Sequence, residues 1–466
     1  MANLLNQFLW ILLILNSILC VSQERSEYIY INHTNIEDHL IKDTKQMLIK
    51  DIEKKIDEFI VYYENHGHPF AQIRLENIQR DTSDLIVKKG SLYTIDSIVI
   101  YGTPNISQKH ISNILNIRKG DVYDQRKMND IKERIKLTGY LNSDKEYELV
   151  FHKNTVDIYL YLIKERNNLI DGMVGFDTEE DKVHINGFTK IKLKNLINKG
   201  ESIEINWHGE QKRFQRMESF INFPYLINPK INIEAHLEIY KQKDNFSNML
   251  AETRIYYKIK NNSSFSVNYQ NKTSIAEQEP FSSSQQNNIG VGVRFNDQES
   301  NEIHLNAYFG KRFPEGQQED NYVFHLNTSN DININKISKI KISSLSSLIF
   351  SQNLYANELL FFGGSKNLRG FGEDEFFANK YSIITAGIHY EIEEIISSSI
   401  FFQQAYFEKN VVNYQKESGW PRSIGFGVGI NNNARHIRIY YAIGVSKSHN
   451  FNLQNGKMHL SIENKF

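Results

Sequence analysis

From about residue 168 onward, the sequence repeats one pattern: segments of roughly ten residues in which apolar and polar side chains alternate. Ile303 and Leu305, for example, alternate with His304 and Asn306. Because successive side chains of a strand point to opposite faces, each segment has one apolar face and one polar face. About sixteen such strands with no intervening helix favour a closed barrel, apolar outside and wet inside.

A soluble all-β protein, such as a propeller, would also show alternating strands. However, no blade-like repeat recurs at a fixed period, so this alternative is the weaker one. The mean hydropathy of −0.48 is typical of soluble proteins, but in a barrel it averages over a lipid-facing and a lumenal face. The formal net charge of −1 provides no field that would favour a nucleic acid partner.

The N-terminus carries the one strongly apolar run, over 8–15. It is too short for a convincing transmembrane helix and is typical of a secretory signal, predicted here at 1–22 with Cys20 and Ser22 as the small residues before cleavage. A lipoprotein anchor at Cys20 is a weaker alternative, because Leu19 stands where a small residue is expected. Cys20 is the only cysteine, so we expect no disulfide and no thiolate metal site in the mature chain.

Two smaller units precede the alternating region. The first, 23–90, has an apolar helical face over 49–63 that stops at the Gly and Pro of 66–69. Two strand-like pieces follow at 70–79 and 85–88. We therefore expect an irregular or truncated α+β unit with a single long helix.

The second unit, 91–165, is more regular. A strand over 93–101 precedes a helix that Ser107 can cap. A second helix ends near Gly139, a natural C-terminal glycine, and a hairpin follows over 145–164. The predicted order is β-α-α-β-β.

The most distinctive stretch of the chain is 361–375, a loop in which four glycines surround a single arginine within Leu368-Arg369-Gly370-Phe371. Glycines at this density indicate a tight and specific backbone path. A lone arginine in such a loop needs a buried carboxylate or a set of acceptors. The plainer alternative is an ordinary glycine-rich hairpin loop.

Leu368-Arg369-Gly370-Phe371 resembles the [VIL]-R-G-[FY] motif of the BamA/TamA superfamily, the bacterial surface antigen family. In that family the motif lies at the tip of the sixth extracellular loop, which folds back into the barrel lumen. The predicted eleven strands before the loop and five after it agree with the family's placement of this loop. The unit 91–165 is similar to the family's periplasmic POTRA module, and the terminal Phe466 to its C-terminal signal.

This resemblance implies a mainly β protein in four parts. They are a signal peptide at 1–22, an irregular or truncated POTRA-like region at 23–90, a POTRA domain at 91–165, and a sixteen-stranded transmembrane β-barrel at 168–466. The chain is accordingly expected in the bacterial outer membrane, with its N-terminal region in the periplasm.

One feature departs from the family pattern. The family often pairs the loop arginine with an aspartate on strand thirteen, where this sequence has Gln404. An amide can accept a hydrogen bond from Arg369 but cannot neutralise its charge. Glu391 is therefore the alternative acidic partner.

The resemblance implies assembly or insertion of other outer-membrane proteins. The implied partners are the lipid bilayer, unfolded outer-membrane protein clients and periplasmic accessory proteins. Clients would bind the POTRA strand edge at 145–152 and a weak seam between 170–176 and 457–466. Two alternatives remain: a two-partner-secretion-type transporter, although no plug helix with a long Pro-rich linker is visible, and a non-catalytic pore or surface protein.

No enzymatic motif is present: G-x-S-x-G, H-E-x-x-H and the P-loop are all missing from the sequence. We therefore expect no enzyme activity, no catalytic residue and no cofactor. His66 and His68 have no third ligand cluster, so a metal site is not expected. Gly425, Gly427 and Gly429 have the wrong spacing for a dinucleotide loop.

Overall fold

The computed structural model describes residues 28–34, 46–79, 82–102, 106–165, 167–179, 182–210, 214–225, 229–242, 244–259, 263–296, 301–392, 395–432 and 435–465. The predicted signal peptide at 1–22 and the terminal Phe466 lie outside these residues. The chain separates into two compact units, the first built mainly from N-terminal residues and the second mainly from the barrel. Within the described ranges, no helix is both long and apolar enough to cross a membrane.

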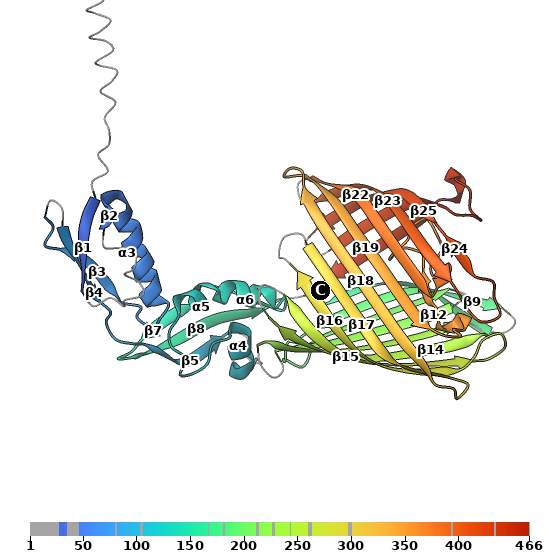
Figure 1. Ribbon diagram of the computed structural model, residues 1–466, viewed down its shortest axis with the longest axis horizontal. Coiled ribbons are helices and arrows are strands. Elements are labelled where there is room, and N and C mark those ends of the chain that lie inside the picture. The colour runs from blue at the N-terminus through green and yellow to red at the C-terminus, as the bar shows by residue number, and fades with distance from the viewer. Residues whose placement is uncertain are drawn as a thin grey trace, which may run out of the picture. The chain divides into compact units, whose positions relative to one another are not determined.

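The N-terminal module (blue in Figure 1) is a four-stranded sheet with one described helix against it. Its strands stand in the order β2-β1-β4-β3, and β1 runs parallel to β4. The predicted helix and both later strands are confirmed, whereas the first two strands were missed. The bounds are β1 (Tyr28–Thr34), β2 (Gln46–Leu48), α3 (Ile49–Glu64), β3 (Gln72–Glu76) and β4 (Thr82–Lys88).

The apolar face of α3 explains why this module holds together. Phe59 and Tyr63 are spaced four residues apart on that face and pack against Leu85 and Val87 of β4. All four side chains are at most 2% exposed. The amphipathic pattern therefore folds the helix onto the sheet, as its period predicts.

The second module has the predicted β-α-α-β-β order, with one additional short strand over 141–143 that was not predicted. Ser107 caps the first helix, because its Oγ accepts a hydrogen bond from the amide of His110 at 3.2 Å. The second predicted helix is divided in two at Asp130. The bounds are β5 (Thr94–Tyr101), α4 (Gln108–Leu115), α5 (Gln125–Asn129), α6 (Ile131–Leu137), β6 (Leu141–Ser143), β7 (Glu148–Phe151) and β8 (Thr155–Lys164).

One edge of the second sheet is formed by two short pieces instead of one long strand. β8 lies between β5 and β6, and β7 also pairs with β8. β6 pairs with β8 from Leu141↔Lys164, and β7 from Glu148↔Tyr159, so their registers differ by two residues. A break of this kind shortens the edge that other strands can join.

From Leu169 to Lys465 the chain forms a closed barrel of antiparallel strands (Figure 1). Neighbouring strands are consecutive in sequence except at three places: β19 and β22, which the long loop separates, β23 and β25, and the closing pair β27 and β9. The bounds are β9 (Leu169–Glu179), β10 (Lys182–Lys194), β11 (Ser202–Glu210), β12 (Phe214–Pro224), β13 (Ile231–Gln242), β14 (Phe246–Lys258), β15 (Ser264–Ala276), β16 (Ser284–Asn296), β17 (Asn301–Pro314), β18 (Glu319–Asn333), β19 (Ser338–Ser351), β22 (Lys380–Ile392), β23 (Ile396–Lys409), β24 (Glu417–Gly419), β25 (Arg422–Asn432), β26 (Arg435–Val445) and β27 (Lys457–Lys465).

The short strand β24 and its successor β25 are two parts of one barrel strand. Both pair with β23 in a single register, from Phe407↔Gly419 to Gln404↔Arg422, so only Trp420-Pro421 interrupts them. Proline has no amide hydrogen and cannot donate to the ladder, which explains the interruption. Counted over the described residues, the barrel has sixteen strands, with eleven before the long loop and five after it, as predicted.

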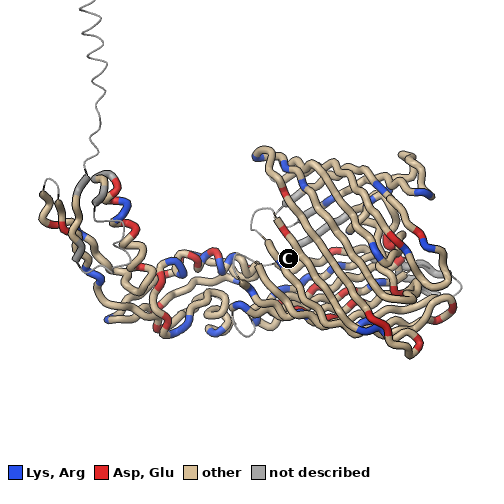
Figure 2. The backbone as a smooth tube through the Cα atoms, viewed as in Figure 1, with Lys and Arg blue, Asp and Glu red and all other residues tan. Residues whose placement is uncertain are grey.

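The alternation of side chains places apolar residues outside and polar residues inside. On β16, Ile289 and Val291 are 65% and 44% exposed. On β15, the lumenal Ser266, Asn268 and Gln270 are buried. Charged residues of β17, β18 and β19 lie mainly near the strand ends (Figure 2). This distribution is that of a barrel whose middle faces hydrocarbon.

The outward position of Val291 yields a test of the membrane-facing surface. Replacing it with arginine would place a charge at the lipid-facing middle of β16 and should lower the free energy of unfolding by about 2–4 kcal/mol. Val291→Leu keeps the site apolar and should leave stability nearly unchanged. Urea unfolding in lipid vesicles measures both, and equal stabilities would mean that this face does not contact lipid.

Candidate functional site

The long loop between β19 and β22 folds against the inner wall of the barrel. It carries a short 3-10 helix η1 (Ala356–Glu358) and the small hairpin of β20 (Leu360–Phe362) and β21 (Phe376–Ala378). We call residues 354–360 the loop base and residues 363–375 the loop tip. The tip contains the predicted motif Leu368, Arg369, Gly370 and Phe371.

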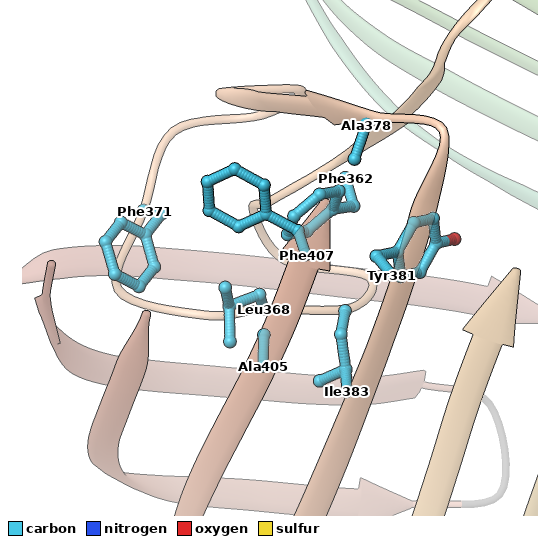
Figure 3. Packing of buried hydrophobic residues seen from close by; sticks show 8 residues of the cluster. All are labelled: Phe362, Leu368, Phe371, Ala378, Tyr381, Ile383, Ala405 and Phe407. Atoms are coloured by element: carbon cyan, nitrogen blue, oxygen red, sulfur yellow. The ribbon is translucent and has the colours of Figure 1, made fainter. Parts of the chain in front are cut away.

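Apolar side chains hold the loop to the last strands of the barrel (Figure 3). Leu368 and Phe371 of the tip are at most 1% exposed. The ring of Phe362 stacks on Tyr381 of β22 with centroids 4.6 Å apart. The cluster comprises Phe362, Leu368, Phe371, Ala378, Tyr381, Ile383, Ala405 and Phe407. The loop therefore forms a packed core inside the lumen and is not a solvated hairpin.

Hydrogen bonds within the tip stabilise its tight path. The amide of Gly363 donates to Asn367 Oδ1 at 2.7 Å. Both the amide and the hydroxyl of Ser365 donate to Glu373 Oε1 at 2.6 Å. The amide of Gly372 donates to Glu375 Oε2 at 2.6 Å. These contacts fix the backbone on both sides of Arg369, whose side chain contacts the barrel wall.

Gly370 makes the closest backbone approach to the wall. Its φ is +87°, and a Cβ added there would lie 2.7 Å from the amide nitrogen of Gly444 on β26. A Cβ on Gly444 would in turn lie 2.6 Å from the carbonyl oxygen of Gly370. Two facing glycines therefore let the two backbones touch, and a side chain at either position would push the loop away.

Arg369 is held by aromatic rings. Its guanidinium carbon lies 4.9 Å from the ring centroid of Phe401 on β23 and 4.6 Å from that of Tyr440 on β26. Among the described residues, no carboxylate lies within the 4.0 Å of an ion pair with Arg369, and its buried Nε has no hydrogen-bond partner. The quadrupoles of the two rings therefore supply the attraction that a carboxylate would otherwise provide.

Gln403 is the amide that contacts the motif, so the prediction of Gln404 is wrong. Gln403 Oε1 accepts from the amide of Arg369 at 2.8 Å, and its Nε2 donates to the carbonyl of Asn367 at 2.7 Å and to Thr385 Oγ1 at 2.9 Å. The amide of Gln404 instead donates to backbone carbonyls at its own strand and its neighbour. Neighbouring residues of a strand face opposite sides, so only one of the pair can reach the lumen.

Glu391 is also not the acidic partner of Arg369. Its carboxylate lies 3.3 Å from Lys339 Nζ, and its side chain is 54% exposed. Glu391 is near the end of β22 and pairs with Ser397 of β23, six residues along the strand from Thr385, which contacts Gln403. The structure thus brings together all four motif residues but neither of the two partners predicted for the arginine.

The tip also contacts the opposite part of the wall, which the sequence did not indicate. Asp374 lies 3.1 Å from Arg216 on β12, and Lys366 lies 3.0 Å from Glu218 on the same strand. The tip therefore spans the lumen, from β12 near the start of the barrel to β23 and β26 near its end.

The loop base has a second attachment that sequence reasoning missed. Arg312 of β17 and Glu358 of η1 form an ion pair with both side chains fully buried. Arginine at a lumenal position of a predicted strand was the only available signal. Its partner could not be identified, because the two residues lie 46 positions apart in the chain.

A polar cavity of about 380 Å³ lies between the loop base and the wall. Its lining contains acidic, basic and aromatic side chains, including Glu218, Glu238, Glu252, Arg254, Lys272 and His325. In the described part of the chain, no group of three His, Cys, Asp or Glu side chains could hold a metal ion. The cavity is thus a lumenal space lined by charged side chains of both signs.

The barrel closes through an unusually short seam. Within the described strands, β27 pairs with β9 only at Asn464↔Ile170 and Lys465↔Leu169. By contrast, β9 pairs with β10 along its whole length, from Leu169 to Glu179. Backbone groups along most of the seam therefore lack the ladder that stabilises every other junction.

Comparison with known proteins identifies both parts of this architecture. Residues 93–166 match the model of the POTRA family, described as a surface antigen variable number repeat. No curated protein matches the chain in sequence.

The solved structures that are similar to the chain include the following three. BamA from Haemophilus ducreyi lacking POTRA domains 1–3 is 12% identical, with 94% of this chain and 99% of that chain covered and a TM-score of 0.56. CdiB from Acinetobacter baumannii is 12% identical, with coverages of 94% and 89% and a TM-score of 0.61. CdiB from Escherichia coli is 11% identical, with coverages of 96% and 92% and a TM-score of 0.64. At these identities the similarity establishes the fold.

The hydrogen bonds of Gln403 lead to a paired mutational test. Gln403→Ala removes its bonds to the loop backbone and to Thr385 and should destabilise the seated tip by about 1–3 kcal/mol. Gln404→Ala should have no such effect, because its side chain faces the other side of the strand. Hydrogen exchange of the amides at 367–371 measures the difference. Equal exchange in the two variants would contradict the assignment of Gln403.

Proposed function

We propose that this POTRA-containing β-barrel protein of the BamA/TamA type inserts client proteins into the bacterial outer membrane. The barrel and POTRA module support a role in protein insertion or transport at that membrane. Insertion is the finer assignment. The observation that carries it is the short seam between β9 and β27.

A weak seam has a direct physical consequence. Unpaired backbone groups cost several kcal/mol each in hydrocarbon, so a strand edge exposed there strongly favours a new partner. Most of β27 faces β9 without pairing to it, and separating the two strands breaks only the ladder at Asn464 and Lys465. The edge thus exposed could pair with the strand of an incoming barrel.

The POTRA module contributes a second strand edge. The amide of His152 donates to the carbonyl of Thr155 at 2.8 Å, which fixes the hydrogen-bonding phase of the hairpin. Because the phase alternates along an antiparallel pair, the amides of Leu149 and Phe151 point away from β8. An extended client segment could add to this edge by β-augmentation. The edge is short, so such binding would be weak and reversible.

The loop tip is suited to couple the two halves of the wall. It touches β12 through Arg216 and touches β23 and β26 through Gln403 and Gly444. Opening the seam moves the last strands relative to the first ones. The seated tip opposes that movement, so its release would accompany client insertion.

The second candidate is transport of a dedicated partner protein through the lumen. Two observations favour it: the similarity in fold to two CdiB structures and the polar cavity beneath the loop base. In this function the loop tip would leave the lumen to open a path, and the seam could stay closed. A passive pore is the third alternative.

Reconstitution tests insertion directly. The purified chain in liposomes should accelerate folding of a urea-denatured outer-membrane barrel. Arg369→Ala removes two desolvated cation–π contacts, worth about 2 kcal/mol, that hold the tip against opening of the seam. It should therefore speed this folding further, by about tenfold or more. No acceleration by a well-folded wild-type chain would favour transport of a dedicated partner or a passive role.

A disulfide across the seam separates insertion from transport. In a Cys20→Ser background, Ile170→Cys with Asn464→Cys joins directly opposite residues of β9 and β27. Oxidation should abolish client insertion, and reduction should restore it. The matched control, Ile439→Cys with Leu460→Cys, locks the fully paired β26–β27 junction and should leave insertion unchanged. If the seam disulfide left insertion intact, lateral opening would be wrong.

A further inference from the structure

The loop is attached to the barrel at two places, and the two attachments differ in chemistry. At the base, Glu358 of η1 meets Arg312 of β17, and both side chains are completely buried. At the tip, Arg369 rests on the rings of Phe401 and Tyr440 without a carboxylate partner among the described residues. The base is thus held by a fully buried ion pair. The tip is held on β23 and β26 by aromatic faces and one amide side chain, and on β12 by two ion pairs that are not fully buried, Asp374 with Arg216 and Lys366 with Glu218.

Every donor of the Arg312 guanidinium is satisfied. Its Nε donates to Glu358 Oε1 at 2.6 Å, and its Nη2 donates to Glu358 Oε2 and to the carbonyl of Asn353. Its Nη1 donates to Glu319 Oε2 at 2.6 Å and to the carbonyl of Gln352 at 3.2 Å. The planar fork therefore binds both the side chain of the loop base and the backbone that leads into it.

The carboxylate of Glu358 is equally well coordinated. Ser284 Oγ of β16 donates to its Oε1 at 2.5 Å, and the amide of Tyr355 donates to its Oε2 at 2.9 Å. Lys272 Nζ of β15 donates to its backbone carbonyl at 3.0 Å. If this buried charge moved away, Arg312 would keep only the carboxylate of Glu319 among the described residues and would have unfilled donors in the lumen wall.

The neighbouring Asn357 extends the attachment to further strands. Its Nδ2 donates to Ser274 Oγ at 2.5 Å and to the carbonyl of Ser282 at 2.8 Å. Its carbonyl accepts from Asn248 Nδ2 of β14 at 2.7 Å. One turn of chain therefore contacts four consecutive barrel strands, β14 to β17.

We propose that Glu358 is a positioning residue that fixes the loop base to β14–β17 through Arg312. With the base fixed, the tip can leave Gln403 and the two aromatic rings while the loop remains inside the barrel. The inference deepens the proposed function by assigning the moving and the stationary part of the loop. Its test measures the loop itself, so its failure is distinguishable from a failure of client insertion.

Hydrogen exchange followed by mass spectrometry on the full chain in nanodiscs resolves the base from the tip. Arg369→Ala should raise exchange at 367–371 by about tenfold while 354–360 stays protected as in the wild type. Glu358→Gln should raise exchange at 354–360 by about tenfold or more, because it removes the one of the two carboxylates paired with Arg312 that belongs to the loop base. If Arg369→Ala loosened base and tip together, the two attachments would not be independent and the proposal would be overturned.

Glu319→Gln is the matched control. Glu319 also binds Arg312, but it belongs to β18 and not to the loop. Its substitution should leave exchange at 354–360 much closer to the wild-type rate than Glu358→Gln does. Equal effects of the two substitutions would mean that the cluster only stabilises the wall. Should Glu358→Gln fail to fold, Ser284→Ala removes a single donor and should raise exchange of the base by a smaller factor, whereas no change would count against the proposal.

Discussion

The structure depends on one constraint: in a bilayer, every backbone amide and carbonyl of a spanning strand must be paired within the protein. Sixteen antiparallel strands meet this requirement by closing on themselves, and fifteen of the junctions do so with long ladders. The β9–β27 junction meets it at only two residue pairs within the described strands. Backbone pairing therefore stabilises the rest of the barrel and is weak at this one junction.

Inside the lumen, the loop connects strands on the two sides of the weakly paired β9–β27 junction. Its apolar cluster lies against β22 and β23, its arginine rests on rings of β23 and β26, and its tip forms ion pairs with β12. These contacts connect the two ends of the strand order without adding a ladder at the seam. The base is attached separately, by a buried ion pair to β17. A buried pair tolerates no partial separation, while stacking on aromatic faces can be lost and regained at lower cost.

The fold and the loop motif were largely predictable because both depend on patterns of residues that are close together in the sequence. Period-two alternation predicted sixteen strands, and the β-α-α-β-β order of the second module followed from a serine cap, a glycine stop and a hairpin. The N-terminal module was predicted less completely: β1 pairs in parallel with β4, some fifty residues away, and no local pattern reports such pairing. The amide side chain that contacts the motif was predicted at Gln404 and is Gln403, one residue earlier. A shift of one residue in a strand moves a side chain from the lumen to the outside. The family pattern alone therefore does not show which residue of the strand faces the lumen.

The sequence by itself determined the alternation, the number of strands, the order of the modules and the glycine-rich path around Arg369. All of these depend on residues close together in the chain. Only the tertiary structure decided which amide reaches the motif, how Arg312 and Glu358 come together, and how short the seam is. These features arise when the sheet curls and closes, because closure sets which faces meet across the lumen and how the first strand registers with the last. Ring closure joins residues that share no local pattern, so their contacts are a property of the barrel as a whole.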